Sequence, residues 1–259
     1  MTNFAYIDGK KIAYDDIGSG IPIVFIHPPG MGRYVFHYQY RLQKKFRVIF
    51  PDLSGHGDSD RLHEHENLIV EYGNEIISLL DTLHISTAVI CGYSAGGTIA
   101  QYLATHFQDR VKGLILFGGY PVVYNTLLAI EHKLGFYMAE NHPNLYATIL
   151  AKSHTKNKTV RKLLIKHMKK SQKEIWARYY EEVLHTNFYD EVDKLTMPIL
   201  LIYGTRSDVF NRYNRIFRKK NKQIRIVFFK RTNHQTLTKR WTLANEEITR
   251  FCNGIMIKK

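Results

Sequence analysis

Short apolar runs alternate with amphipathic segments through the first half of the chain, and this alternation strongly constrains the fold. The runs have the length of buried strands and fall at 22–26, 46–50, 88–91 and 111–117. Segments with helical spacing of apolar residues separate them, at 34–44, 68–83 and 98–107. The alternation predicts an α/β fold with a mostly parallel sheet and helices on both faces. A turn at Asp8-Gly9, between apolar runs 4–7 and 11–16, predicts an antiparallel hairpin at the start.

The alternation stops between residues 120 and 193, where the spacing is helical throughout and aromatic residues are dense. It resumes with predicted strands at 198–203 and 224–229 and predicted helices at 209–219 and 241–251. We therefore expect a helical cap, residues 120–193, inserted into an α/β core made of residues 1–119 and 194–259.

A glycine-flanked serine lies where the third of these buried runs meets the next helix. Gly92-Tyr93-Ser94-Ala95-Gly96 has the form Gly-x-Ser-x-Gly. Such a turn holds its serine in a strained conformation, with the hydroxyl projecting from the edge of the sheet. Glycine is needed at both flanking positions because a side chain there would collide with the neighbouring strand or helix. The motif also occurs by chance, so alone it leaves open a glycine-rich connection without chemistry.

A serine hydroxyl needs a positioned base, and the base needs an orienting acid. In parallel sheets such groups come from loops at the carboxyl ends of strands. Strand 198–203 leads to Asp208, and strand 224–229 leads to His234. Asp208 also suits the N-cap of the following helix, and His234 also suits a cap of the last one. Asp193 is an alternative acid, but it precedes its strand and belongs at the opposite edge of the sheet.

The chain resembles the α/β-hydrolase superfamily over nearly all of its length. Five segments carry the resemblance in the order found in that superfamily: the loop 27–30, the loop 52–59, the elbow 92–96, the loop 204–208 and His234. The resemblance implies that Ser94 is the nucleophile, His234 the general base and Asp208 the acid that orients it. It also implies that His27, His56 and Asp52 brace the loops around the site.

One loop departs from the superfamily pattern. The resemblance implies a His-Gly-x-Gly sequence whose residue x donates a backbone N–H to the oxyanion, but Pro28 and Pro29 align there. Proline has no N–H, so a second donor must come from a shifted loop or from a side chain. The N–H of Ala95 supplies the first. The candidate oxyanion and substrate-binding residues are therefore Ala95, Gly30, Met31, Pro29 and Tyr93.

The net charge of +14 bears on possible partners. Residues 152–173 contain nine Lys or Arg and no acid, and a second basic stretch covers 206–231. Such stretches can bind nucleic acid or anionic membranes. We expect no nucleic-acid partner, because no nucleic-acid motif or aromatic–basic interleaving occurs. Attachment of 152–173 to a membrane surface is a weaker alternative, because the charges surround the predicted helix.

Other features favour a cytoplasmic protein. No run of about 18 uncharged apolar residues is present, so we expect no stable membrane insertion. Residues 1–10 lack the pattern of a signal peptide. Cys91 and Cys252 are too few for a disulfide framework.

Taken together, these features predict a serine hydrolase without metal or organic cofactor that cleaves a small or medium apolar ester through an acyl-enzyme, as a carboxylesterase does. The aromatic cap predicts an apolar pocket over Ser94. Ser94 argues against haloalkane dehalogenases and epoxide hydrolases, which this resemblance associates with a nucleophilic aspartate. A lactonase, a carbon–carbon bond hydrolase and a non-catalytic ligand-binding or signalling protein remain as alternatives. The sequence leaves the oligomeric state open.

Overall fold

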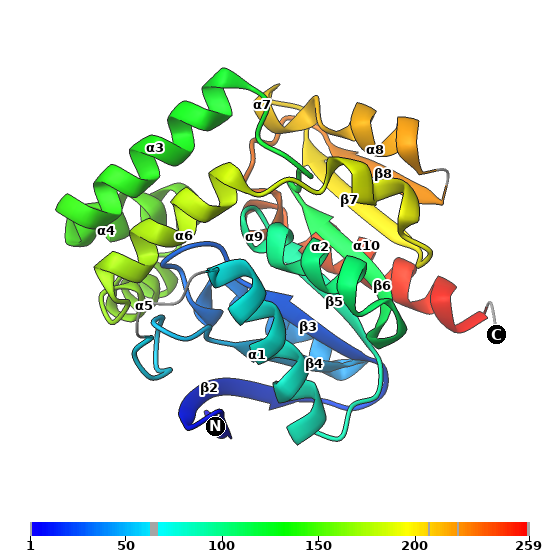
Figure 1. Cartoon of the computed structure of the whole chain (residues 1–259), viewed down its shortest axis with the longest axis horizontal. Coiled ribbons are helices and arrows are strands. Elements are labelled where there is room, and N and C mark those ends of the chain that lie inside the picture. Colours follow the sequence, from blue (N-terminus) through cyan, green and yellow to red (C-terminus); the bar gives the residue numbers. More distant parts are fainter. Residues whose placement is uncertain (1, 63–66, 207, 222, 258–259) are drawn as a thin grey trace.

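Eight strands form one mixed sheet in the computed structural model of the chain. The strands are β1 (Asn3–Ile7), β2 (Lys10–Ile17), β3 (Pro22–Ile26), β4 (Arg47–Pro51), β5 (Ala88–Tyr93), β6 (Val111–Phe117), β7 (Ile199–Gly204) and β8 (Ile224–Phe229). Their order is β1-β2-β4-β3-β5-β6-β7-β8, and all pairs from β4 to β8 are parallel (Figure 1). The structure describes residues 2–62, 67–206, 208–221 and 223–257, and the side chains of Asp208 and Ile257 lie outside the described part.

The antiparallel hairpin predicted at Asp8-Gly9 is confirmed. β1 pairs with β2 in the register that brings Ile7 opposite Lys10. Both turn residues have positive φ, 47° for Asp8 and 76° for Gly9, as a two-residue type I′ turn requires. The hairpin joins the sheet because β2 pairs antiparallel with β4. The sheet is therefore mostly parallel with one antiparallel edge.

Helices cover both faces of the sheet and its carboxyl edge (Figure 1). The α-helices are α1 (Leu68–Thr82), α2 (Gly96–His106), α3 (Thr126–Asn141), α4 (Pro143–His154), α5 (Lys158–Met168), α6 (Lys173–His185), α7 (Asp208–Asn211), α8 (Asn214–Lys220), α9 (Thr236–Lys239) and α10 (Trp241–Ile257). The 3₁₀ helices are η1 (Arg33–Phe36), η2 (Gln39–Lys44), η3 (Gln108–Arg110) and η4 (Tyr189–Lys194).

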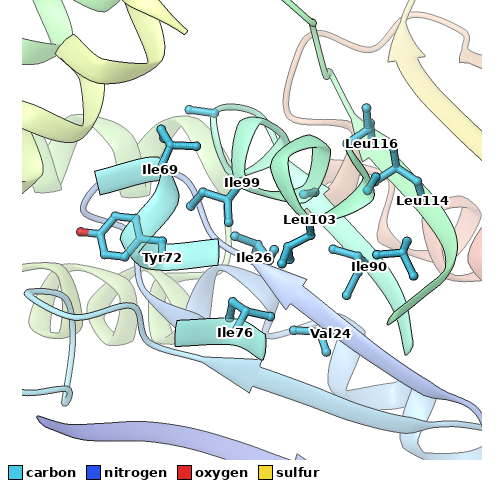
Figure 2. Close-up of a cluster of buried hydrophobic side chains, with 14 of the residues drawn as sticks. Val24, Ile26, Ile69, Tyr72, Ile76, Ile90, Ile99, Leu103, Leu114 and Leu116 are labelled. Carbon is cyan, nitrogen blue, oxygen red and sulfur yellow. The ribbon is translucent and has the colours of Figure 1, made fainter. Parts of the chain in front are cut away.

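Two apolar layers hold the sheet between its helices. Alternate residues of the central strands face α1 and α2 on one side, and Figure 2 shows Ile76 of α1 and Ile99 of α2 in the same apolar layer as Val24 and Ile26 of β3. The strand residues between them, such as Phe25, face η1, η2 and α10 on the other side. Because both faces are buried, the central strands read as continuous apolar runs rather than alternating ones.

Two predicted helices differ in the structure. Residues 34–44 form η1 and η2 instead of one α-helix, and the buried residues Arg33, Phe36, Gln39 and Leu42 recur every three positions, which is the period of a 3₁₀ helix. Residues 209–219 are divided between α7 and α8. There the Asn214 side chain donates to the carbonyl of Asn211 and competes with the helical backbone bonds.

Residues between β6 and β7 form the helices α3 to α6 and η4, in agreement with the helical pattern of that stretch. Side chains of α3, α4 and α6 line one cavity together with the loops that follow β3, β5 and β8. These helices therefore lie over the carboxyl ends of the strands. Among the described residues, no helix has both the length and the apolar character needed to span a bilayer.

Candidate active site

The turn after β5 has the strained geometry that its sequence predicts. Ser94 has a φ of 54°, in the left-handed region that non-glycine residues rarely adopt. A side chain at Gly92 would overlap the backbone of Gly97, and one at Gly96 would overlap the carbonyl of Ile26. Sterics thus require glycine at both positions. The Ser94 N–H donates to the Phe117 carbonyl at 2.8 Å, which fixes the turn against β6.

Ser94 and His234 meet although 140 residues separate them. Nε2 of His234, in the loop after β8, lies 2.7 Å from Oγ of Ser94. Phe210 stacks on the imidazole, with ring centroids 3.7 Å apart. Burial, with smaller effects of His154 and His132, lowers the pKa of His234 to about 3. The imidazole is therefore neutral near pH 7 and able to accept a proton at Nε2.

The segment that carries Asp208 is bonded to the loop that carries His234. The Arg206 N–H donates to the Thr232 carbonyl, and the Arg231 N–H donates to Oγ1 of Thr205, both at 2.9 Å. Asp208 is the first residue of α7, but its side chain lies outside the described residues. Among the side chains that are described, none accepts a hydrogen bond from the buried Nδ1 of His234.

The loop after β3 forms a tight turn at the two prolines. The Met31 N–H donates to the Pro28 carbonyl at 3.2 Å, and Gly30 has a φ of 73°. The Met31 amide is therefore engaged within the turn. The N–H of Ala95, the residue directly after Ser94, has no acceptor among the described residues. Ala95 also lines the cavity.

A small cavity of about 80 Å³ lies over Ser94. Pro28, Pro29, Met31 and Tyr93 line it from the sheet side, together with Ser94 and His234. Its lining from the helices between β6 and β7 includes Glu131, His132, Tyr146, Ser153, His154 and Tyr180. The predicted aromatic residues thus line the cavity, but several are tyrosines, so the cavity is more polar than the predicted apolar pocket.

Hydrogen bonds between these groups fix the cavity wall. Oη of Tyr93 lies 3.0 Å from Nε2 of His154, and Oη of Tyr120 lies 2.8 Å from Nε2 of His132. Each histidine approaches a helix carbonyl with Nδ1, so each Nε2 accepts from the tyrosine. Burial lowers the pKa of both histidines to about 4. No motif marks His132 or His154, and sequence reasoning did not find them.

His27 and Asp52 join the loops beneath the site and do not line the cavity. Nδ1 of His27 lies 2.9 Å from the Pro28 carbonyl, and the Leu53 N–H donates to Nε2 at 3.1 Å. His56 is likewise buried, with Nδ1 3.1 Å from the Ser54 carbonyl. These contacts agree with the bracing that the resemblance implies for the two loops.

Asp52 is the centre of a buried ion-pair cluster. It binds the Arg33 guanidinium, accepts from the Arg33 N–H at 2.7 Å and lies 2.9 Å from Nε2 of His167 in α5. Burial opposes ionisation, but His167, Arg33 and His27 hold the pKa of Asp52 below its usual range. Asp52, Asp58 and His167 have the donor types of a metal site, within 4.8 Å of one another. The Arg33 guanidinium already pairs with both carboxylates, so we assign the cluster to structure.

Comparison with known proteins decides the family. A family model described as alpha/beta hydrolase fold matches residues 21–191, well over half of the chain. The chain belongs to the α/β-hydrolase family.

Solved structures of α/β-hydrolases match almost the whole chain. An esterase from Exiguobacterium antarcticum has a TM-score of 0.86 at 20% identity and covers 97% of this chain and 99% of its own. An enol-lactonase from Burkholderia xenovorans LB400 has a TM-score of 0.84 at 21% identity and covers 97% and 100%. At these identities the similarity shows a shared fold.

Curated α/β-hydrolases match more closely over a shorter stretch. The 2-hydroxymuconate semialdehyde hydrolase of Pseudomonas sp. (strain CF600) is 34% identical over 132 residues, which are 49% of this chain and 47% of that protein. The matches to such curated relatives span about half of their length or less. The similarity therefore identifies the family and leaves the reaction to the site.

Proposed function

We propose that this α/β-hydrolase cleaves small carboxylic esters through an acyl-enzyme on Ser94. The observation that carries the proposal is the 2.7 Å separation of Nε2 of His234 from Oγ of Ser94, both of which line the small cavity. A serine near neutral pH becomes nucleophilic only when a base at hydrogen-bond distance takes its proton. The neutral imidazole of His234 meets that requirement.

In the first half of the reaction, Oγ of Ser94 attacks the ester carbonyl while its proton passes to Nε2 of His234. The negative charge on the former carbonyl oxygen is stabilised by the free N–H of Ala95 at the start of α2. The imidazolium then gives its proton to the departing alcohol as the carbon–oxygen bond breaks. Ser94 is left acylated.

In the second half, water attacks the acyl-enzyme and gives its proton to His234. The carboxylic acid leaves as the proton returns to Ser94. We assign to Asp208 the role of holding Nδ1–H of His234 and stabilising the imidazolium. The bonds that join the loop before Asp208 to Thr232 and Arg231, close to His234, support this assignment.

The cavity favours a short acyl group. Its volume of about 80 Å³ is far below the roughly 300–1,000 Å³ of sites for drug-sized ligands. The hydroxyl of Tyr180 accepts from Tyr146 at 2.9 Å and lines the cavity, where its own proton is available to a substrate oxygen. We therefore propose a small acyl group with some polar character rather than a wholly apolar one.

Hydrolysis of p-nitrophenyl acetate and octanoate, with fluorophosphonate labelling, tests this function. We expect labelling and turnover of acetate in wild type, a kcat/KM for octanoate at least tenfold lower, and neither activity in Ser94→Ala. Ser153→Ala removes another serine of the same cavity and is the matched control that must keep both. Folded wild-type protein that is neither labelled nor active would refute the nucleophile. Labelling without ester turnover would point to lactone or carbon–carbon bond cleavage instead.

A further inference from the structure

A second, larger cavity lies on the other side of the loop that carries His234. Its volume is about 540 Å³, within the range of small-molecule sites. It is bounded by the α4–α5 loop, the β7–α7 loop, the β8–α9 loop and the start of α10. His154 lines both this larger cavity and the one above Ser94.

Five cationic side chains converge on the larger cavity from these separate segments, and its lining contains no acid. They are Lys156, Arg206, Arg231, Lys239 and Arg240, which together we call the basic pocket. Among the described side chains, no carboxylate lies within 4.0 Å of any of them. Cations elsewhere do have such partners, for example Arg47 with Asp16 and Arg110 with Asp81. The basic pocket thus concentrates positive charge that no described carboxylate compensates.

The positive charges in the basic pocket also repel one another. Partial burial and the neighbouring Lys156 lower the pKa of the Lys239 ammonium. Among the described residues, Nζ of Lys239 is bonded only to a neutral partner, Oε1 of Gln235 at 3.3 Å. Nε of Arg240 donates to Oγ1 of Thr232 at 3.2 Å. An anion in the basic pocket would relieve this repulsion, and several cations from different directions suit a group with more than one negative charge.

A buried hydroxyl in the same wall gives independent support. Thr238 is only 4% exposed and lines the basic pocket, yet its Oγ1 has no hydrogen-bond partner among the described residues. Buried polar atoms are almost always satisfied, and an orphaned one calls for an explanation. Because Oγ1 is closed off from solvent, the Thr238 side chain must turn toward the cavity before a ligand oxygen can supply the missing partner.

We propose that the basic pocket binds a phosphorylated small molecule, a phosphate monoester or a diphosphate. The phosphate belongs either to the ester that Ser94 cleaves or to a separate effector. Binding of the phosphate in the basic pocket does not depend on hydrolysis by Ser94. Arg231 and Lys239 hold its oxygens, and Thr238 donates to one of them. Because His154 is hydrogen-bonded to Tyr93, an occupied pocket is coupled to the residue next to Ser94.

Calorimetric titration of Ser94→Ala protein with pyrophosphate at constant ionic strength tests binding apart from catalysis. In that background, Arg231→Gln with Lys239→Gln is expected to weaken binding about tenfold or more. Lys162→Gln with Lys166→Gln removes the same charge from exposed positions of α5 outside the pocket and must leave it within about twofold. Thr238→Val tests the hydroxyl without changing charge and is expected to weaken binding severalfold. Thermal melts establish that each variant is folded.

Absence of saturable binding, or equal weakening by both double variants, would overturn the proposal. So would saturable binding to duplex DNA or anionic vesicles in place of pyrophosphate.

A second experiment distinguishes a phosphorylated substrate from a separate effector. It compares, in wild type, two acetyl esters that differ only in a phosphate on the alcohol. A kcat/KM at least tenfold higher for the phosphorylated ester, lost in the pocket variant, identifies the phosphate as part of the substrate. Equal kcat/KM values with a pyrophosphate effect on kcat identify an effector.

Discussion

Phe210 lies face to face with His234, with ring centroids 3.7 Å apart and ring planes inclined by only 15°. Phe210 is itself buried and belongs to α7, which begins at Asp208. One short helix therefore both shields the imidazole from water and carries the residue to which we assign its orientation.

Removing the Phe210 ring should raise the pKa of His234, because burial is the main cause of its low value. Catalysis needs the neutral imidazole, so activity is lost as pH falls through that pKa. The acid limb of the kcat/KM profile of Phe210→Ala is expected to move to higher pH than in wild type. A pH profile of p-nitrophenyl acetate hydrolysis measures this. Phe210→Tyr keeps the stack and should keep the wild-type limb, and an unshifted limb in Phe210→Ala would refute shielding.

Asp208→Asn should reduce kcat by roughly 10²–10⁴, because an amide cannot stabilise the imidazolium and favours the wrong tautomer. KM should change little, since Asp208 does not contact the acyl group in the proposed mechanism. Asp193→Asn, at the alternative acid in η4, is the matched control and should retain wild-type kcat. Loss of activity in Asp193→Asn alone would reassign the acid.

Pro29→Ala should increase kcat. It restores a backbone N–H where the family pattern has an oxyanion donor, and one such donor is worth about 10²–10³ in rate when fully aligned. We expect a gain of about tenfold, because the turn from Pro28 to Met31 was not shaped around that amide. Pro28→Ala restores an N–H one residue earlier and should give no gain. Equal kcat in wild type and Pro29→Ala would show that a side chain already supplies the second donor.

Glu75 should make the protein less stable as pH rises. This buried carboxyl accepts from the Ser54 N–H at 3.1 Å, and burial raises its pKa from 4.5 to about 7. Between pH 4.5 and 7 the folded state keeps a proton on Glu75 that the unfolded state loses. The contribution of Glu75 to the free energy of unfolding is therefore greatest below pH 4.5 and declines as the pH rises to 7. The shift corresponds to about 3 kcal/mol in the free energy of unfolding.

The Glu75→Gln variant isolates this contribution. Its free energy of unfolding, relative to wild type, should rise by about 3 kcal/mol between pH 4.5 and 8. Urea denaturation at several pH values measures the difference, and Glu246→Gln removes an exposed carboxylate as the control. A difference that stays constant with pH would show that Glu75 ionises normally.

Local sterics and strand-length apolar runs made the centre of the fold predictable. Gly92 and Gly96 are required by contacts within a few residues of Ser94 or with the adjacent strand, so the sequence indicated the elbow directly. The strand ends then placed His234 beside Ser94, because parallel strands bring their carboxyl ends to one edge.

The cavity wall was not predictable in the same way. His132 and His154 line it only because α3 and α4 pack over the carboxyl edge, and that packing depends on contacts remote in sequence. The basic pocket likewise combines Lys156 with residues 206–241. The basic stretches were visible in the sequence, but their meeting at one cavity was not. For the segment 34–44, the sequence did not reveal the 3₁₀ helices, because two of the four buried residues at three-residue spacing, Arg33 and Gln39, are polar.

The contact of His167 with Asp52 limits how this chain can be recombined with its relatives. The helices between β6 and β7 look like an exchangeable module, but α5 supplies the imidazole that pairs with a buried carboxylate of the sheet domain. A chimaera that received these helices from a family member without an equivalent imidazole would leave Oδ1 of Asp52 without that partner. To change the substrate preference by transplanting these helices, the new helices must therefore carry a residue equivalent to His167.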